Sequence, residues 1–250
     1  MHVLLRNPMR MMAVAGFALS LGACATTKTA RVEKPAGEAA LDDTALRARV
    51  EEGALLMARD HQPQRAIDQY FDPVIQRYAT HLKGVKERVY CASTTQETLA
   101  YMVIAASDGV TAVAKSETFA LAHFLKAYGL VELHDMDGAR VELDKALALS
   151  PMNSQYLSEL GNWFQARRDF PSALDAFKKA LDAAPLSREE FILPRKTRAL
   201  RGIGFSLIEL DRLDEAEVQF REALRIDPED AKAKGELQYI QKMRAQKPGI

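Results

Sequence analysis

The second half of the chain repeats a pattern of small, aromatic and proline residues with a period of 34 residues. Each of the three copies ends at one proline. The last two of these prolines are 43 residues apart because the final copy carries an insertion of nine residues. A repeat of this length is typical of a solenoid, in which helix pairs stack and share one continuous core. The anchoring prolines are Pro151, Pro185 and Pro228.

Each proline is preceded at fixed distances by residues suited to a crossing of two helices. Alanines stand twelve and five residues before it, Leu143, Phe177 or Phe220 stands eight before, and Ala127, Gly161 or Gly204 stands twenty-four before. Small residues allow two helix axes to approach to about 8–10 Å. Proline follows the second helix because it cannot continue one.

Two copies of this pattern resemble the tetratricopeptide repeat. The copies run from Leu160-Gly161 to Pro185 and from Ile203-Gly204 to Pro228, and the copy ending at Pro151 is weaker. The resemblance implies an all-α fold, a right-handed superhelical solenoid of antiparallel helix pairs. It would have a degenerate helical N-terminal part and a C-terminal capping helix.

The first 24 residues have the pattern of an export signal. Arg6 and Arg10 precede a short apolar run over 11–21, which is too short to span a bilayer. Leu21-Gly22-Ala23-Cys24 resembles the bacterial lipobox, which implies an acylated Cys24 and a mature chain that begins there. Because Ala25 follows, the resemblance implies the periplasmic face of the outer membrane. An ordinary signal peptide and a buried apolar N-terminus with an incidental cysteine are the alternatives.

The whole chain divides into segments by composition and periodicity. We expect a signal peptide over 1–23, a flexible tether over 24–40, a helical region with degenerate repeats over 41–117, three repeats over 118–228, and a capping helix and tail over 229–250. Within the helical region, Asp72-Pro73 should kink or restart a helix, and Thr94-x-x-Glu97 should cap another. The inserted residues 186–194 should lengthen a connection. Cys91 is expected to be buried.

No pattern of residues indicates an enzyme. The five histidines show no metal-ligand spacing, there is no CxxC, and no phosphate loop or nucleophile elbow occurs. The 34 basic and 34 acidic residues balance, which gives no sign of a nucleic-acid surface. We therefore expect no catalytic residues, no metal and no cofactor.

Binding of a protein partner is the remaining interpretation. In tetratricopeptide proteins the first helix of each pair lines a concave groove, which would hold a protein or peptide. The positions that helical spacing places in this groove are Phe124, Tyr128, Gln155, Asn162, Gln165, Arg198, Arg201 and Phe205. Asn162 and Arg198 also match two positions of the carboxylate-clamp repeats, which grip the C-terminus of a partner. A mixed polar groove is the alternative.

Two functional hypotheses follow. The first is a membrane-anchored periplasmic scaffold or adaptor lipoprotein, non-catalytic, that docks protein partners in its groove and attaches to the membrane through its acylated N-terminus. The alternative is a pilotin-like or secretion-assembly lipoprotein that guides a multimer to the outer membrane. A homodimer through the end faces of the solenoid is compatible with both.

Overall fold

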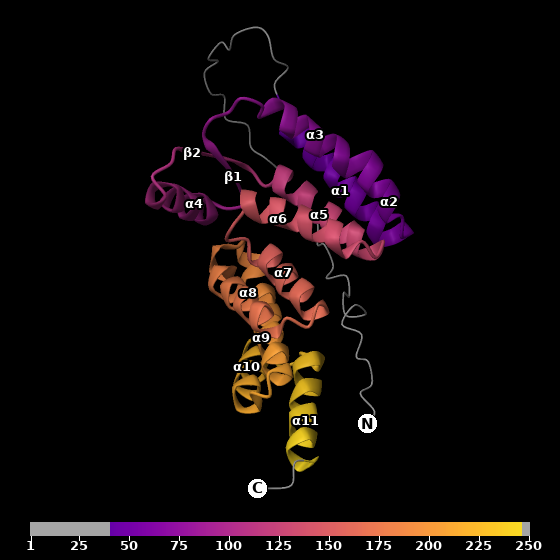
Figure 1. Cartoon of the computed structure of the whole chain (residues 1–250), viewed down its shortest axis with the longest axis vertical. Helices are drawn as coiled ribbons and strands as arrows, with labels where there is room; N and C mark the ends of the chain where they lie inside the picture. Colours follow the sequence, from indigo (N-terminus) through magenta and orange to yellow (C-terminus); the bar gives the residue numbers. More distant parts are fainter. Residues whose placement is uncertain (1–40, 247–250) are drawn as a thin grey trace.

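The computed structural model describes residues 41–246, so the predicted signal peptide, Cys24 and the tether lie outside the described residues. Helices dominate, and they pack in antiparallel pairs along the long axis of the molecule (Figure 1). The pairs are α5 (Thr118–Glu132) with α6 (Met136–Leu149), α7 (Ser154–Ala166) with α8 (Phe170–Ala183), and α9 (Glu189–Glu209) with α10 (Leu213–Ile226). The predicted all-α solenoid of helix pairs is confirmed.

The turn inside each pair has the same geometry. His134, Arg168 and Asp211 adopt left-handed backbone conformations, with φ of 64°, 61° and 58°. In the first two pairs an aspartate follows at once, and its side chain accepts a hydrogen bond from an N–H in the first turn of the second helix. These capping contacts offset the strain of a positive φ at a non-glycine residue. The turns therefore repeat with the same spacing as the sequence.

Helix crossings explain why the repeat requires glycine. A Cβ added at Gly161 would lie 2.6 Å from the ring of Phe177, and one at Gly204 would lie 2.6 Å from the ring of Phe220. Phe177 also faces Gly202 of the next pair, so that its ring fills the space between two first helices. The aromatic residue of each second helix therefore packs where the first helix has no side chain.

The N-terminal region begins with two helical rods. α1 (Asp43–Asp60) lies against a rod made of α2 (Pro63–Ala66), a π-helical turn (Ile67–Phe71) and α3 (Asp72–His81). Asp72-Pro73 was expected to kink or restart a helix. In the structure the π-helical turn ends just before Asp72, and α3 begins there within the same rod. Pro73 has no N–H to give to the carbonyl of Gln69, and the Arg49 guanidinium donates to that oxygen at 2.6 Å.

The segment 88–116 contains two strands that the sequence analysis did not predict. β1 (Arg88–Ala92) and β2 (Ala112–Ser116) pair in parallel, with Tyr90 opposite Ala114, and α4 (Thr95–Ser107) connects them. Thr94 caps α4 as predicted, by accepting from the N–H of Glu97 at 3.0 Å. This β1–α4–β2 unit stands to one side of the helical stack (Figure 1).

The insertion before the third pair is helical, so the prediction of a longer connection was wrong. After a 3₁₀ turn (Ala184–Leu186), α9 starts at Glu189 and includes Pro194 in its second turn. Pro194 is the sixth residue of α9 and has no N–H to give to the carbonyl of Glu190, but Glu190 is exposed, so that water can satisfy this carbonyl. The inserted residues therefore extend α9 to 21 residues.

The last helix, α11 (Ala231–Gln246), closes the stack as predicted. Ala233 and Ile240 are buried in the core shared with α9 and α10, and Leu237 and Met243 pack against it. Asp230 begins the helix, because its carboxylate accepts from the N–H groups of Lys232 and Ala233 at 3.0 and 3.1 Å.

Substitution of Gly202 by alanine tests the close packing. In an exposed helix this change raises the free energy of unfolding by up to about 1 kcal/mol. Here the new methyl group would overlap the ring of Phe177, so we expect a loss of about 1–3 kcal/mol in urea denaturation. Gly235→Ala in α11 is the matched control, because nothing lies within 4 Å of its added Cβ. An equal increase in the free energy of unfolding in both variants would contradict close packing of Phe177 on Gly202.

A buried polar contact joins the two helices of the first pair. The Nδ1 of His123 in α5 donates to Oε2 of Glu142 in α6 at 2.6 Å, and Lys145 donates to the other carboxylate oxygen at 2.9 Å. Burial alone would raise the pKa of Glu142. The bonds from His123 and Lys145 and the charge of Lys126 outweigh it and lower the pKa to about 2.

This shift predicts a pH-dependent contribution to stability. Because the folded pKa lies below that of the unfolded chain, the stabilisation is complete above about pH 4.5 and is lost as pH falls toward 2. Glu142→Gln should cost about 2–3 kcal/mol at neutral pH, and the difference from the parent chain should shrink in acid. Denaturation series between neutral pH and about pH 3 measure this. A difference in stability between Glu142→Gln and the parent chain that does not change with pH would contradict the lowered pKa of Glu142.

Candidate protein-binding face

Side chains from three first helices come together on one face of the stack. We call this the α5–α7–α9 face and define it by Tyr128 of α5, by Gln155, Glu159 and Asn162 of α7, and by Arg195, Arg198, Arg201 and Phe205 of α9. All eight are half-buried, which leaves part of each side chain accessible. Six of the eight were predicted from helical spacing alone, and Tyr128 is near Glu159 and Arg198.

Glu159 is the centre of this face. One carboxylate oxygen accepts from the guanidinium of Arg198 across to α9, and the other accepts from the Asn162 amide at 2.9 Å. Burial, together with the negative charges of Glu132 and Glu159, raises the pKa of Tyr128, and Arg198 opposes this shift. The two residues that matched a carboxylate clamp thus already hold a carboxylate that belongs to the chain itself.

Two other predicted residues are engaged in helix packing. Arg201 pairs with the carboxylate of Asp230, the residue that caps α11. The Gln165 amide donates to the carbonyl of Gly202 at 3.1 Å and to the hydroxyl of Ser206 at 3.0 Å. Gln165 therefore links α7 to α9, and a partner that used its amide would have to break these bonds.

Arg195 is a cation on this face whose hydrogen bonds go to neutral groups. Its guanidinium donates to the Ser187 hydroxyl at 2.7 Å and more weakly to the Gln155 side-chain oxygen at 3.4 Å. It lies 5.4 Å from the ring centroid of Phe191. Burial lowers the pKa of Arg195, while the charges of Glu97 and Glu117 act in the opposite direction. The sequence analysis did not name Arg195, although it lies one helical turn before Arg198.

Phe124 does not belong to the face, and its prediction as a groove residue is corrected. Its side chain is 4% exposed and stacks on Tyr156 with ring centroids 4.5 Å apart. Phe124 belongs to a core in which α5 and α6 pack with Tyr156 of α7 and Cys91 of β1. Helical spacing could not reveal a core that includes a residue of an unpredicted strand.

Within 41–246, no group of three or more His, Cys, Asp or Glu side chains is placed to hold a metal ion. Cys91 is buried as predicted, and burial raises the pKa of its thiol to about 12. Over the same residues, no helix has the length and apolar character needed to cross a membrane.

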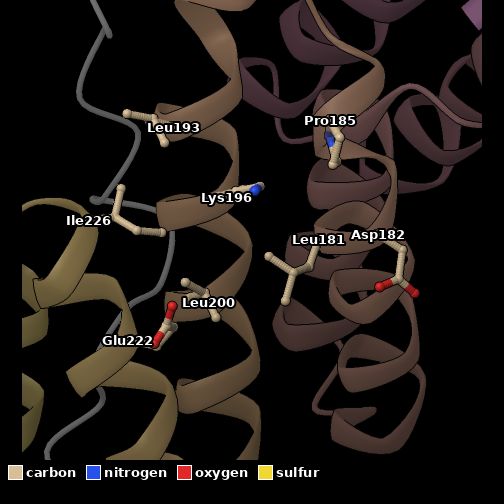
Figure 2. A pocket seen from close by; sticks show the side chains of 8 residues that line it. All are labelled: Leu181, Asp182, Pro185, Leu193, Lys196, Leu200, Glu222 and Ile226. Carbon is tan, nitrogen blue, oxygen red and sulfur yellow. The ribbon is translucent and has the colours of Figure 1, made fainter. Parts of the chain in front are cut away.

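A separate cleft lies between α8, α9 and α10, with a volume of about 440 Å³. Figure 2 shows Leu181 of α8 pointing toward α9 and Lys196 of α9 pointing toward α8, whereas Leu193 of α9 lies on the side of Ile226. Leu193 comes from the inserted residues, so the longer α9 creates part of this cleft. Its walls are mainly aliphatic, and none of the buried unpartnered polar atoms belongs to its lining.

Comparison with solved structures supports the fold assignment. Neither a protein-family model nor a curated protein sequence matches this chain. PilF of Pseudomonas aeruginosa is 15% identical with a TM-score of 0.56, over 81% of this chain and 70% of that one. A MamA RS-1 double mutant is 15% identical with a TM-score of 0.53, over 83% and 87%.

A third similar structure covers half of this chain. The first tetratricopeptide domain of Spaghetti (RPAP3), bound to an HSP90 peptide, is 21% identical over 50% of this chain and 93% of that one, with a TM-score of 0.44. The helix pairs, their repeated turns and the likeness to PilF and MamA lead to one conclusion about architecture. The chain has the fold of a tetratricopeptide-repeat solenoid.

A double-mutant cycle tests the central ion pair of the face. The side chain of Glu159 is 12% exposed, so Arg198→Ala should leave its carboxylate without a cation and cost about 1–3 kcal/mol of stability. Glu159→Gln in the same chain should recover part of that loss, with a coupling energy of about 0.5–3 kcal/mol from urea denaturation. Additive effects of the two substitutions would show that the pair contributes no coupling.

Proposed function

We propose that this chain is a membrane-anchored periplasmic scaffold or adaptor lipoprotein that binds protein partners on the α5–α7–α9 face and performs no catalysis itself. The observation that carries the proposal is the gathering of half-exposed polar and aromatic side chains from three successive first helices. A surface of this kind can hold an extended peptide or a partner helix over several repeats.

The face offers recognition groups of several kinds. The Gln155 and Asn162 amides can satisfy a peptide backbone, Tyr128 and Phe205 provide aromatic surface, and Arg195 is a cation without an acidic hydrogen-bond partner among the described residues. Aromatic residues and arginine are the residue types that dominate binding energy at protein interfaces. The ion pair of Glu159 with Arg198 fixes the orientation of its neighbours before any partner arrives, which lowers the entropy cost of binding.

The proposed anchor rests on the sequence. Arg6 and Arg10, the apolar run and Leu21-Gly22-Ala23-Cys24 together support export and acylation at Cys24. Each buried methylene of an acyl chain contributes about 0.8 kcal/mol, and stable anchoring takes more than one chain. We further propose that the anchored chain resides at the periplasmic face of the outer membrane.

Photo-crosslinking in cells tests the binding face. A photoreactive residue is placed at position 162 on α7, and a matched control at the exposed position 178 on α8, followed by mass spectrometry. We expect one periplasmic protein to be trapped from 162 and not from 178. If that protein is a subunit of an outer-membrane multimer, the assembly-factor alternative replaces the scaffold.

The contradicting results are equally definite. Diffuse products, or the same products from both positions, would show that the α5–α7–α9 face is not the surface that binds the partner. Tyr128→Ala with Phe205→Ala should lower recovery of the partner while leaving the helical content of the chain unchanged, because both side chains are half-exposed. Undiminished recovery would also contradict the proposal.

A further inference from the structure

The outer face of α4 exposes apolar surface that the repeat fold does not use. Tyr101 and Ala105 are buried beneath the helix, where they pack with Tyr90. On the opposite side Leu99 and Val103 are 63% and 68% exposed, more than any other large hydrophobic side chain among residues 41–246. They lie one helical turn apart and so form a continuous patch.

Charged side chains are absent from this part of the helix. No Asp, Glu, Lys or Arg occurs from Thr98 to Ser107, in a chain of which 27% is charged. A helix of a soluble domain normally carries polar side chains on its outer face. Contact with an apolar or interfacial environment would therefore bury this patch favourably.

The path of the chain indicates which environment lies nearby. Residues 1–40 precede the described part, which enters the fold beside the β1–α4–β2 unit. The Asp43 carboxylate accepts from the hydroxyl of Ser116 at 2.6 Å, at the end of β2. Cys24 and Leu41 are 17 residues apart in the sequence, and a random coil of that length has a root-mean-square end-to-end distance of about 20–24 Å. An acyl group at Cys24 would keep this unit close to a bilayer.

The charged side chains of this unit balance. From Lys83 to Glu117 four are basic and four are acidic, the exposed Glu87 lies beside Lys86 in the sequence, and Arg88 is paired with Asp108. Attachment of this unit to a bilayer would therefore depend on its apolar patch.

The size of the patch argues against a protein as its main occupant. A stable protein interface buries about 800 Å² on each partner. A patch centred on two side chains of a 13-residue helix is much smaller. A small contact is sufficient, however, when a covalent lipid already holds the chain at the surface, because the second contact forms within one molecule.

We propose that the outer face of α4 rests on the bilayer that carries the lipid anchor, with Leu99 and Val103 inserted at the level of the headgroups. This contact rests on the anchor of the proposed function and would orient the solenoid relative to the membrane. It assigns the β1–α4–β2 unit a role separate from partner binding.

Site-specific fluorescence tests the contact in the exported, acylated full chain. Val103→Cys in α4 and Val141→Cys in α6 carry the same environment-sensitive label, and Val141 is the control because it is also exposed. Acylation blocks Cys24, and Cys91 is buried, so the introduced thiol is the one that reacts. Vesicles of phosphatidylethanolamine and phosphatidylglycerol carry a lipid-attached quencher.

We expect a blue shift and quenching at position 103 and neither at 141. Adding Leu99→Gln should abolish the difference between the two positions. Equal signals at both positions, no quenching at 103 in a chain that floats with the vesicles, or a shift that grows with protein concentration without lipid would overturn the proposal. The last result would indicate a second copy of the chain.

The anchor and the α4 contact can fail separately. Mass spectrometry of the purified chain reports acylation at Cys24 independently of the fluorescence. An unacylated chain would overturn the proposed anchor, and quenching at 103 above that at 141 would then still support the α4 contact. An unacylated chain with no such difference would overturn both.

Discussion

The structure depends on the close approach of each first helix to an aromatic side chain of the second. Phe177 shows the constraint most clearly, because its ring lies against Gly161 of its own pair and Gly202 of the next. This single ring sets the spacing between two repeats. The spacing in turn places α7 beside α9, so that Glu159 reaches Arg198 and the two helices share one face. A side chain larger than hydrogen at either glycine would separate the helices that form this face.

Acidic side chains organise the charges on that side of the molecule. Glu159 holds Arg198, Asp230 holds Arg201, and Glu117 holds both Arg47 and Arg188. Each carboxylate joins residues that are distant in sequence, so these pairs connect α1, α7, α9 and α11 as well as balance charge. A partner that brings its own carboxylate must compete with Glu159 at Arg198, whereas within residues 41–246 Arg195 hydrogen-bonds to the neutral side chains of Ser187 and Gln155.

The sequence predicted the elements whose signals are local and periodic. The glycines, alanines and prolines of the repeat identified the three pairs, and the apolar positions of α11 identified its buried side. Contacts over long sequence distances were not predictable in this way. The strand β1 is five residues long, and the core in which Phe124 packs with Cys91 of this strand could not be foreseen. Glu159 and Arg198 are 39 residues apart, and the inserted residues 186–194 were expected to lengthen a connection where the structure begins α9.

We propose that partners bind across the first helices of successive pairs. The most direct measurement is an experimental structure of the chain with its captured partner bound. We expect partner atoms to contact Tyr128, Asn162 and Arg195, and therefore α5, α7 and α9 together. A partner seated in the cleft between α8, α9 and α10, or on α4 alone, would contradict it.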